Sequence, residues 1–236
     1  MIILTTGLSG SSPVAGLIAR AGYWAGESTH KKRDYDTFEN QKLIELNLKI
    51  LSDVAYSGKY EMEFSRDAID RIAESANRAD LSPYADFVSL CNQHGPWIWK
   101  DPRLWLTIRF WRHVLRLDDV QFIVLMRDHL QTWVSTTIRR QIHSYGYSKR
   151  YTEQVRGSIV EFLDGHDQPY LELLFEDLVI HPERTLDEIN GFLGTGLGMD
   201  DLKTIYTKPL YKRPRGVADF VKATMIYAKN YRSRYR

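Results

Sequence analysis

The sequence predicts an α/β fold with three layers, in which helices cover both faces of a central parallel sheet. Four strand-like segments alternate with helical patterns, the arrangement that βαβ crossover connections produce. The clearest segment, residues 120–126 (VQFIVLM), is an almost continuous apolar run, typical of a strand buried on both faces. Since ligands of such folds bind beyond the carboxyl ends of the strands, we expect a site at that edge.

The start of the chain combines a strand, a turn and a helix. Residues 1–4 are apolar, residues 5–12 (TTGLSGSS) form a turn rich in glycine and hydroxyl groups, and residues 13–22 have a helical pattern. We expect Ser12 as the N-cap and Pro13 at the first helical position. The free N–H groups and the dipole of such a helix bind anions, usually phosphate. The alternative is an ordinary strand–turn–helix entry, because the turn lacks the lysine of a Walker A motif.

The middle of the chain is predicted to be helical after a polar loop at residues 27–35. Apolar residues at helical spacing predict helices over residues 37–56, 65–78 and 82–91. Ser65 is the expected N-cap of the second of these helices. We therefore expect one domain over residues 1–236, with a helical insertion at about 36–92.

Strands and helices alternate again in the second half. Strands are predicted at residues 97–99, 120–126 and 169–175, and helices at residues 104–116, 129–143, 151–163, 182–193 and 217–231. Gly194 is expected to end the fourth of these helices. Polar groups follow the strands directly, namely Lys100-Asp101-Pro102-Arg103, Arg127-Asp128 and Glu176-Asp177.

Composition limits the class of protein. Apolar residues make up 43% of the 236 residues, enough for a buried core, and the single Cys91 suits a reducing compartment. No apolar run has the length of a membrane span, so we expect a cytoplasmic protein without stable membrane insertion. A basic tail, residues 203–236, holds ten basic residues and one acidic residue. No nucleic-acid-binding motif accompanies this charge, so we expect no nucleic acid as partner, and nothing indicates an oligomeric state.

Two basic residues stand where strands end. Arg127 follows the 120–126 strand, and Ser135 lies about two turns up the next helix, with Arg139 one turn further. An arginine and a serine placed in this way would hold a second phosphate, although an ion pair is the common role of an isolated arginine. Lys100 follows an apolar Trp-Ile-Trp segment, and the alternative for it is a paired or snorkelling lysine.

Four motifs occur in a fixed order: Ser9-Gly10-Ser11-Ser12, Lys100-Asp101-Pro102-Arg103, Arg127 through Ser135, and Phe175-Glu176-Asp177-Leu178 followed by Pro182 and Phe192-Leu193-Gly194. In this order they resemble the sulfotransferase superfamily, and within it the bacterial and Golgi-like branch. Members of that superfamily use 3′-phosphoadenosine 5′-phosphosulfate. The resemblance covers roughly residues 1–195 and implies a P-loop NTPase-like sulfotransferase fold.

The resemblance also implies a role for each matching residue. Ser9, Gly10, Ser11 and Ser12 would hold the 5′-phosphosulfate; Arg127, Ser135 and Arg139 the 3′-phosphate; Phe175 the adenine; and Lys212 and Arg213 would belong to a basic segment that closes over the nucleotide. Lys100 would contact the sulfuryl group and the leaving phosphate oxygen. The family requires no metal, and we expect none here.

A general base for the acceptor is expected at Glu39, in the segment Phe38-Glu39-Asn40, which is similar to a segment of the bacterial enzymes. Its alternative is an acidic residue that interacts with the dipole of a helix N-terminus. Glu27 and His30 are the reserve candidates. The chain differs from the family that it resembles at Leu8, where that family has arginine or lysine.

The resulting expectation is a sulfotransferase that acts on a hydroxyl-bearing acceptor, such as a sugar, a lipid or a small molecule. Two other function classes stay open. One is a P-loop-like kinase of nucleotides or small molecules, against which the missing loop lysine argues. The other is a non-catalytic nucleotide-binding relative with the same fold.

Overall fold

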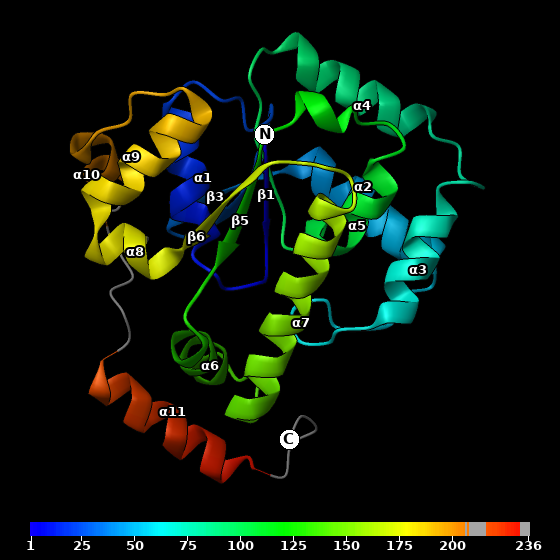
Figure 1. Ribbon diagram of the computed structural model, residues 1–236. Helices are drawn as coiled ribbons and strands as arrows, with labels where there is room; N and C mark the ends of the chain where they lie inside the picture. The colour runs from blue at the N-terminus through cyan, green and yellow to red at the C-terminus, as the bar shows by residue number, and fades with distance from the viewer. Residues whose placement is uncertain (206, 208–215, 232–236) are drawn as a thin grey trace.

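A computed structural model describes residues 1–205, 207 and 216–231 of the chain, and its centre is a four-stranded parallel sheet. The strands are β1 (Ile2–Thr5), β4 (Trp99–Lys100), β5 (Phe122–Met126) and β6 (Tyr170–Leu174). Their order is β4–β1–β5–β6, so β1 and β5 lie in the middle (Figure 1). The predicted α/β class with a parallel sheet is confirmed.

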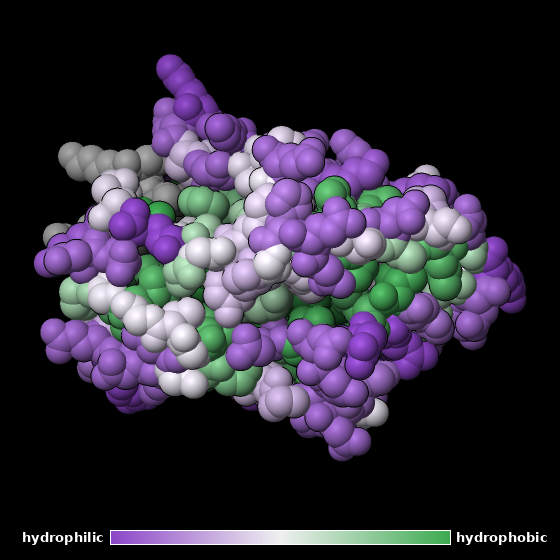
Figure 2. Space-filling view, turned by 90° about the horizontal axis from the view of Figure 1, so that it is seen from above, coloured by the Kyte–Doolittle hydropathy of each residue, from purple (hydrophilic) through white to green (hydrophobic). Residues whose placement is uncertain are grey.

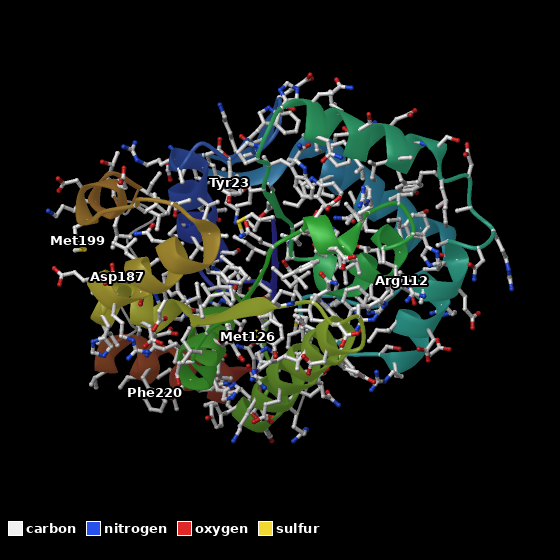
Figure 3. The ribbon with its side chains drawn as sticks, turned by 45° about the horizontal axis from the view of Figure 1, so that its top comes forward. Tyr23, Arg112, Met126, Asp187, Met199 and Phe220 are labelled. Atoms are coloured by element: carbon white, nitrogen blue, oxygen red, sulfur yellow. The ribbon has the colours of Figure 1, made fainter. Side chains whose placement is uncertain are left out.

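Helices cover both faces of this sheet (Figure 1). On one side lie α1 (Ser11–Arg20), α8 (Phe175–Ile180), α9 (Pro182–Leu193) and α10 (Met199–Ile205). On the other side lie α2 (Gln41–Asp53), α3 (Arg66–Ser75), α4 (Ser82–Gln93), α5 (Leu104–Trp111) and α7 (Tyr145–Asp164). In Figure 3, Met126 at the end of β5 lies between Asp187 of the first layer and Arg112 beside the second.

Alternation along the strands divides the core between these layers. Ile3 and Ile123 pack in the cluster that includes α1 and α9, whereas Ile2 and Phe122 pack in the cluster with α2 to α5 and α7. The second cluster is rich in aromatic rings, and the Trp99 and Trp111 ring centroids lie 4.7 Å apart. Both faces of β1 and β5 are therefore buried, which explains their continuous apolar sequences.

An antiparallel hairpin replaces the loop predicted at residues 27–35 and the start of the helix predicted at 37–56. It consists of β2 (Thr29–Lys32) and β3 (Tyr35–Asn40). The Asp36 carboxylate fixes it by accepting hydrogen bonds from the backbone N–H of Phe38 at 2.7 Å and from the Thr29 hydroxyl at 2.5 Å. The Phe38 ring packs against α1, where a Cβ on Gly16 would lie 2.6 Å from a ring carbon. This contact between distant segments overrides the local helical pattern.

Helix boundaries follow capping and backbone geometry. The predicted cap at Ser65 is confirmed, and Gly194, with φ 67°, ends α9 as predicted. The helix predicted at 129–143 is shorter: α6 (His129–Ile138) ends before Arg140, whose φ of 68° lies outside the helical region. The helix predicted at 151–163 is longer, because α7 begins at Tyr145. The Ser144 hydroxyl caps it by accepting from the Tyr147 N–H at 3.1 Å.

The last described helix, α11 (Val217–Lys229), confirms the helix predicted at 217–231 and packs on α6. Ala223 is fully buried there, and the ring of Phe220, which Figure 3 labels, lies 6.0 Å from the ring of Trp133. No helix within the described ranges combines the length and apolar character needed to cross a membrane. Viewed from above, the molecule is largely covered by hydrophilic residues, with hydrophobic ones in the hollows between them (Figure 2).

Candidate functional site

The turn between β1 and α1 presents the N-terminus of a helix. Gly10, not the predicted Ser12, is the N-cap of α1, and its φ of 81° turns the chain into the helix one residue after it. No side chain of the described residues caps the first turn, and these residues leave its N–H groups available to an anion. Gly10 is also required sterically, because a Cβ would lie 2.3 Å from the Phe175 ring. Leu8 adopts a left-handed φ of 63°, which marks the loop as strained.

The serines of this loop have different surroundings. Ser9 is buried, and its hydroxyl pairs with that of Thr5, which donates in turn to the Leu125 carbonyl at 2.7 Å. Ser9 therefore anchors the loop to β5. Ser11 and Ser12 are half-buried and line a cavity of about 220 Å³. The two of them are better placed than Ser9 to contact a ligand.

The structure brings the two predicted catalytic residues into contact. Lys100, at the end of β4, donates to the Glu39 carboxylate at 2.6 Å, and its Nζ lies 3.5 Å from the Ser12 hydroxyl. Lys100 is 1% exposed and the Glu39 side chain 16%. Burial lowers the pKa of the Lys100 ammonium, and the Glu39 carboxylate opposes that shift. A carboxylate, an ammonium group and a helix N-terminus thus lie next to one another.

Glu39 reaches this position from a strand. It is the penultimate residue of β3, and Asn40 after it caps α2 by accepting from the N–H groups of Lys42 and Leu43. Glu39 therefore does not occupy the helix's first turn, which was the alternative role for it. Of the reserve bases, His30 lines the same cavity, whereas Glu27 lines a separate one beside Trp24.

Asp101 follows Lys100 directly and is held by a network of hydrogen bonds. Its carboxylate is fully buried and accepts from the Asn47 amide at 3.1 Å and from the backbone N–H and Nη1 of Arg103 at 2.8 and 2.9 Å. Burial raises the pKa of this carboxyl, while Arg103 opposes the shift. The Arg103 guanidinium in turn lies 4.7 Å from the Tyr60 ring centre. This network fixes the chain on both sides of Pro102.

Arg127 links β5 to the loop. Its Nε donates to Glu176 at 3.1 Å, its Nη1 donates to the Leu8 carbonyl at 3.2 Å, and its guanidinium lies 5.4 Å from the Phe175 ring centre. Glu176 also accepts from the Asp128 N–H at 2.9 Å. The ion pair considered from the sequence is therefore present. Phe175 is 1% exposed and supports the loop, so its contact with adenine stays a prediction.

The remaining residues that were predicted to bind the sulfuryl donor lie in three different parts of the chain. Ser135 is buried, and its hydroxyl oxygen has no hydrogen-bond partner among the residues that the structure describes. Arg139, just after α6, lines the cavity. Lys212 and Arg213 lie outside the described residues.

Five further residues line the cavity, and only His30 among them was a candidate from the sequence. They are His30, Lys32, Tyr35, Tyr60 and Glu61. The first three come from the hairpin that was expected as a loop. Tyr60 and Glu61 come from the segment between α2 and α3, where the Tyr60 carbonyl accepts from the Tyr151 hydroxyl at 2.6 Å and the Glu61 carboxylate accepts from the Gln141 amide at 2.9 Å.

Comparison with solved structures identifies the architecture. A sulfotransferase domain from the Synechococcus PCC 7002 olefin synthase aligns over 100% of this chain and 87% of its own, with a TM-score of 0.51 and 20% identity. The chain has the sulfotransferase fold. A sulfotransferase domain from the curacin biosynthetic pathway also has a TM-score of 0.51, with 15% identity over 93% of this chain and 81% of that one. Neither a protein-family model nor a curated protein matches the sequence.

Proposed function

We propose that this protein transfers the sulfuryl group of 3′-phosphoadenosine 5′-phosphosulfate to a hydroxyl group of an acceptor such as a sugar, a lipid or a small molecule. The observation that carries the proposal is the contact of Lys100 with both Glu39 and Ser12 at the N-terminus of α1. A helix N-terminus favours the phosphate, the lysine stabilises charge on the oxygens, and the carboxylate accepts a proton. The sulfotransferase fold supports this proposal.

The residues of this chain suit such a donor. The first turn of α1, which no described side chain caps, would hold the 5′-phosphosulfate together with Ser11 and Ser12. The Ser135 hydroxyl lacks a partner within the described ranges, and a buried hydroxyl without one is unfavourable unless a ligand provides it. Ser135 would therefore bind the 3′-phosphate together with Arg127 and Arg139.

The chemistry assigns one task to each catalytic residue. The acceptor oxygen forms a bond to sulfur while the bond from sulfur to the 5′-phosphate oxygen breaks, and the electron pair of that bond remains on the phosphate oxygen. Glu39 takes the proton of the acceptor hydroxyl. Lys100 stabilises the charge on the leaving oxygen, as in phosphoryl transfer.

Calorimetric binding of 3′-phosphoadenosine 5′-phosphate tests the proposal without a known acceptor. Ser135→Ala removes no hydrogen bond that the described residues make, so it should leave the unfolding midpoint unchanged but weaken binding by about fivefold. Arg127→Ala should weaken binding about tenfold or more. The control is Arg116→Ala, an exposed arginine outside the cavity.

Each outcome distinguishes the function classes. Absence of binding to the wild-type protein at millimolar nucleotide would refute the sulfotransferase proposal. Mg²⁺-dependent ATP turnover would support a kinase instead. Binding of the nucleotide without sulfation of any member of a broad hydroxyl panel would support the non-catalytic alternative.

A further inference from the structure

The turn between β1 and α1 contains no cation. The first basic residue of the sequence is Arg20, at the end of α1, and position 8 in the loop is leucine. The charge of Lys100 is compensated, because its ammonium lies 2.6 Å from the Glu39 carboxylate. Negative charge on the oxygens of a transferring sulfuryl group therefore requires a further cation from elsewhere in the chain.

Lys32 is placed to supply that charge. It ends β2 and lines the same cavity as Lys100, Glu39 and Ser12. Within the described part of the chain it forms no ion pair, and its ammonium lies 5.6 Å from the Tyr35 ring centre. Arg139 also lines the cavity, and like Lys32 it forms no ion pair with a described residue.

The Lys32 charge also acts on the site electrostatically. The pKa of Lys100 is lowered chiefly by burial and raised by Glu39 and Asp101, and the Lys32 ammonium adds a smaller lowering effect. Lys32 and Lys100 also line the same cavity. An anion in that cavity would be attracted by both groups.

The neighbouring lysine provides an internal comparison. Lys31 precedes Lys32 on β2 and pairs in register with Asp36, while Lys32 pairs with Tyr35. Adjacent residues of a strand point to opposite faces, and Lys31 is absent from the cavity lining. The two lysines thus lie on the same strand, are both exposed and carry the same charge, but only Lys32 lines the cavity.

We propose that Lys32 is a further catalytic residue, whose ammonium donates a hydrogen bond to an oxygen of the transferring sulfuryl group and supplies the positive charge that the loop lacks at Leu8. This inference rests on the proposed function. Lys32 forms no covalent bond in the reaction. Sulfur exchanges its bond to the 5′-phosphate oxygen for one to the acceptor oxygen, and Glu39 receives the proton.

The test compares two nucleotides that differ only in the sulfuryl group. Calorimetry would measure the affinities of Lys32→Ala for 3′-phosphoadenosine 5′-phosphosulfate and for 3′-phosphoadenosine 5′-phosphate, without any acceptor. We expect about tenfold weaker binding of the first and less than twofold change for the second, because a charge-assisted hydrogen bond to the sulfuryl group is lost. Lys31→Ala is the matched control and should change neither affinity, while Lys32→Arg should retain most of the binding.

A second variant tests the link to position 8. In the double variant Lys32→Ala with Leu8→Lys, a loop lysine should restore most of the lost affinity for the sulfated nucleotide. Equal weakening of both nucleotides by Lys32→Ala would overturn the inference, as would equal effects of Lys31→Ala and Lys32→Ala or no effect of either. If the wild-type protein bound neither nucleotide, the proposed function itself would fail, which is a separate result.

Discussion

The buried pair of Lys100 and Glu39 makes a quantitative prediction about stability. Replacing Glu39 with glutamine removes the charge 2.6 Å from an ammonium that is 1% exposed. Removal of one partner from a buried pair typically destabilises a protein by about 3–5 kcal/mol. Glutamine keeps an oxygen that can accept from Nζ, and the Glu39 side chain is 16% exposed. We therefore expect a loss of about 2 kcal/mol in the free energy of unfolding at pH 7.

The pH dependence of this loss has a definite sign. Burial lowers the pKa of Lys100 in the folded protein, so the unfolded chain keeps this proton to higher pH. Between the two pKa values the unfolded state binds more protons, and stability from this group rises with pH. Without Glu39, which raises the pKa of Lys100, that rise begins at lower pH. The difference between wild type and Glu39→Gln should therefore shrink as pH rises toward 10.

Urea unfolding followed by tryptophan fluorescence measures this effect at pH 7 and pH 9. Glu45→Gln is the control, since Glu45 pairs with Lys42 on the exposed surface of α2 at 3.3 Å and its side chain is 55% exposed. The Glu45→Gln variant should lose no more than about 0.5 kcal/mol in the free energy of unfolding. Equal stability of Glu39→Gln and Glu45→Gln at pH 7, or a difference that grows with pH, would refute the reasoning.

Two further predictions concern the core and the loop. Cys91 is the single cysteine and is fully buried, and burial raises its pKa to about 11, so roughly 0.1% is thiolate at pH 8. In urea, a thiol reagent should therefore label Cys91 no faster than the protein unfolds. Rapid labelling of the native protein would contradict this prediction. Gly10→Ala should lower the free energy of unfolding by about 1–3 kcal/mol more than Gly194→Ala does. Both glycines have positive φ, but only a Cβ at position 10 would meet a ring, that of Phe175. Similar thermal unfolding midpoints for the two variants would contradict this prediction.

The sheet could be predicted because its signal is local. The continuous apolar run of β5 indicates burial on both faces, and Phe122 and Ile123 do pack into the two opposite core clusters. Parallel strands place their ends at one edge, so the approach of Lys100 to the β1–α1 turn followed from topology. These inferences needed only the period of the sequence and the rules of chain connection.

The hairpin could not be predicted in the same way. Residues 29–40 contain few apolar residues, and their structure depends on the Asp36 carboxylate and on Phe38 packing against Gly16 of α1. Tyr60 similarly owes its place to Tyr151, which lies far along the chain. Such contacts carry no periodic signal, although they position residues that line the same cavity as Lys100.

Arg127 shows why a motif alone does not assign a role. The sequence allowed a phosphate ligand or an ion pair, and the structure gives a contact with Glu176 together with a hydrogen bond to the Leu8 carbonyl. Arg127→Ala would therefore loosen the loop whether or not the side chain also touches a phosphate. Ser135→Ala avoids this ambiguity, because its hydroxyl makes no hydrogen bond to a described residue that the substitution could break. A loss of nucleotide affinity at unchanged stability in that variant would thus locate the second phosphate beside α6, which the Arg127 variant cannot do by itself.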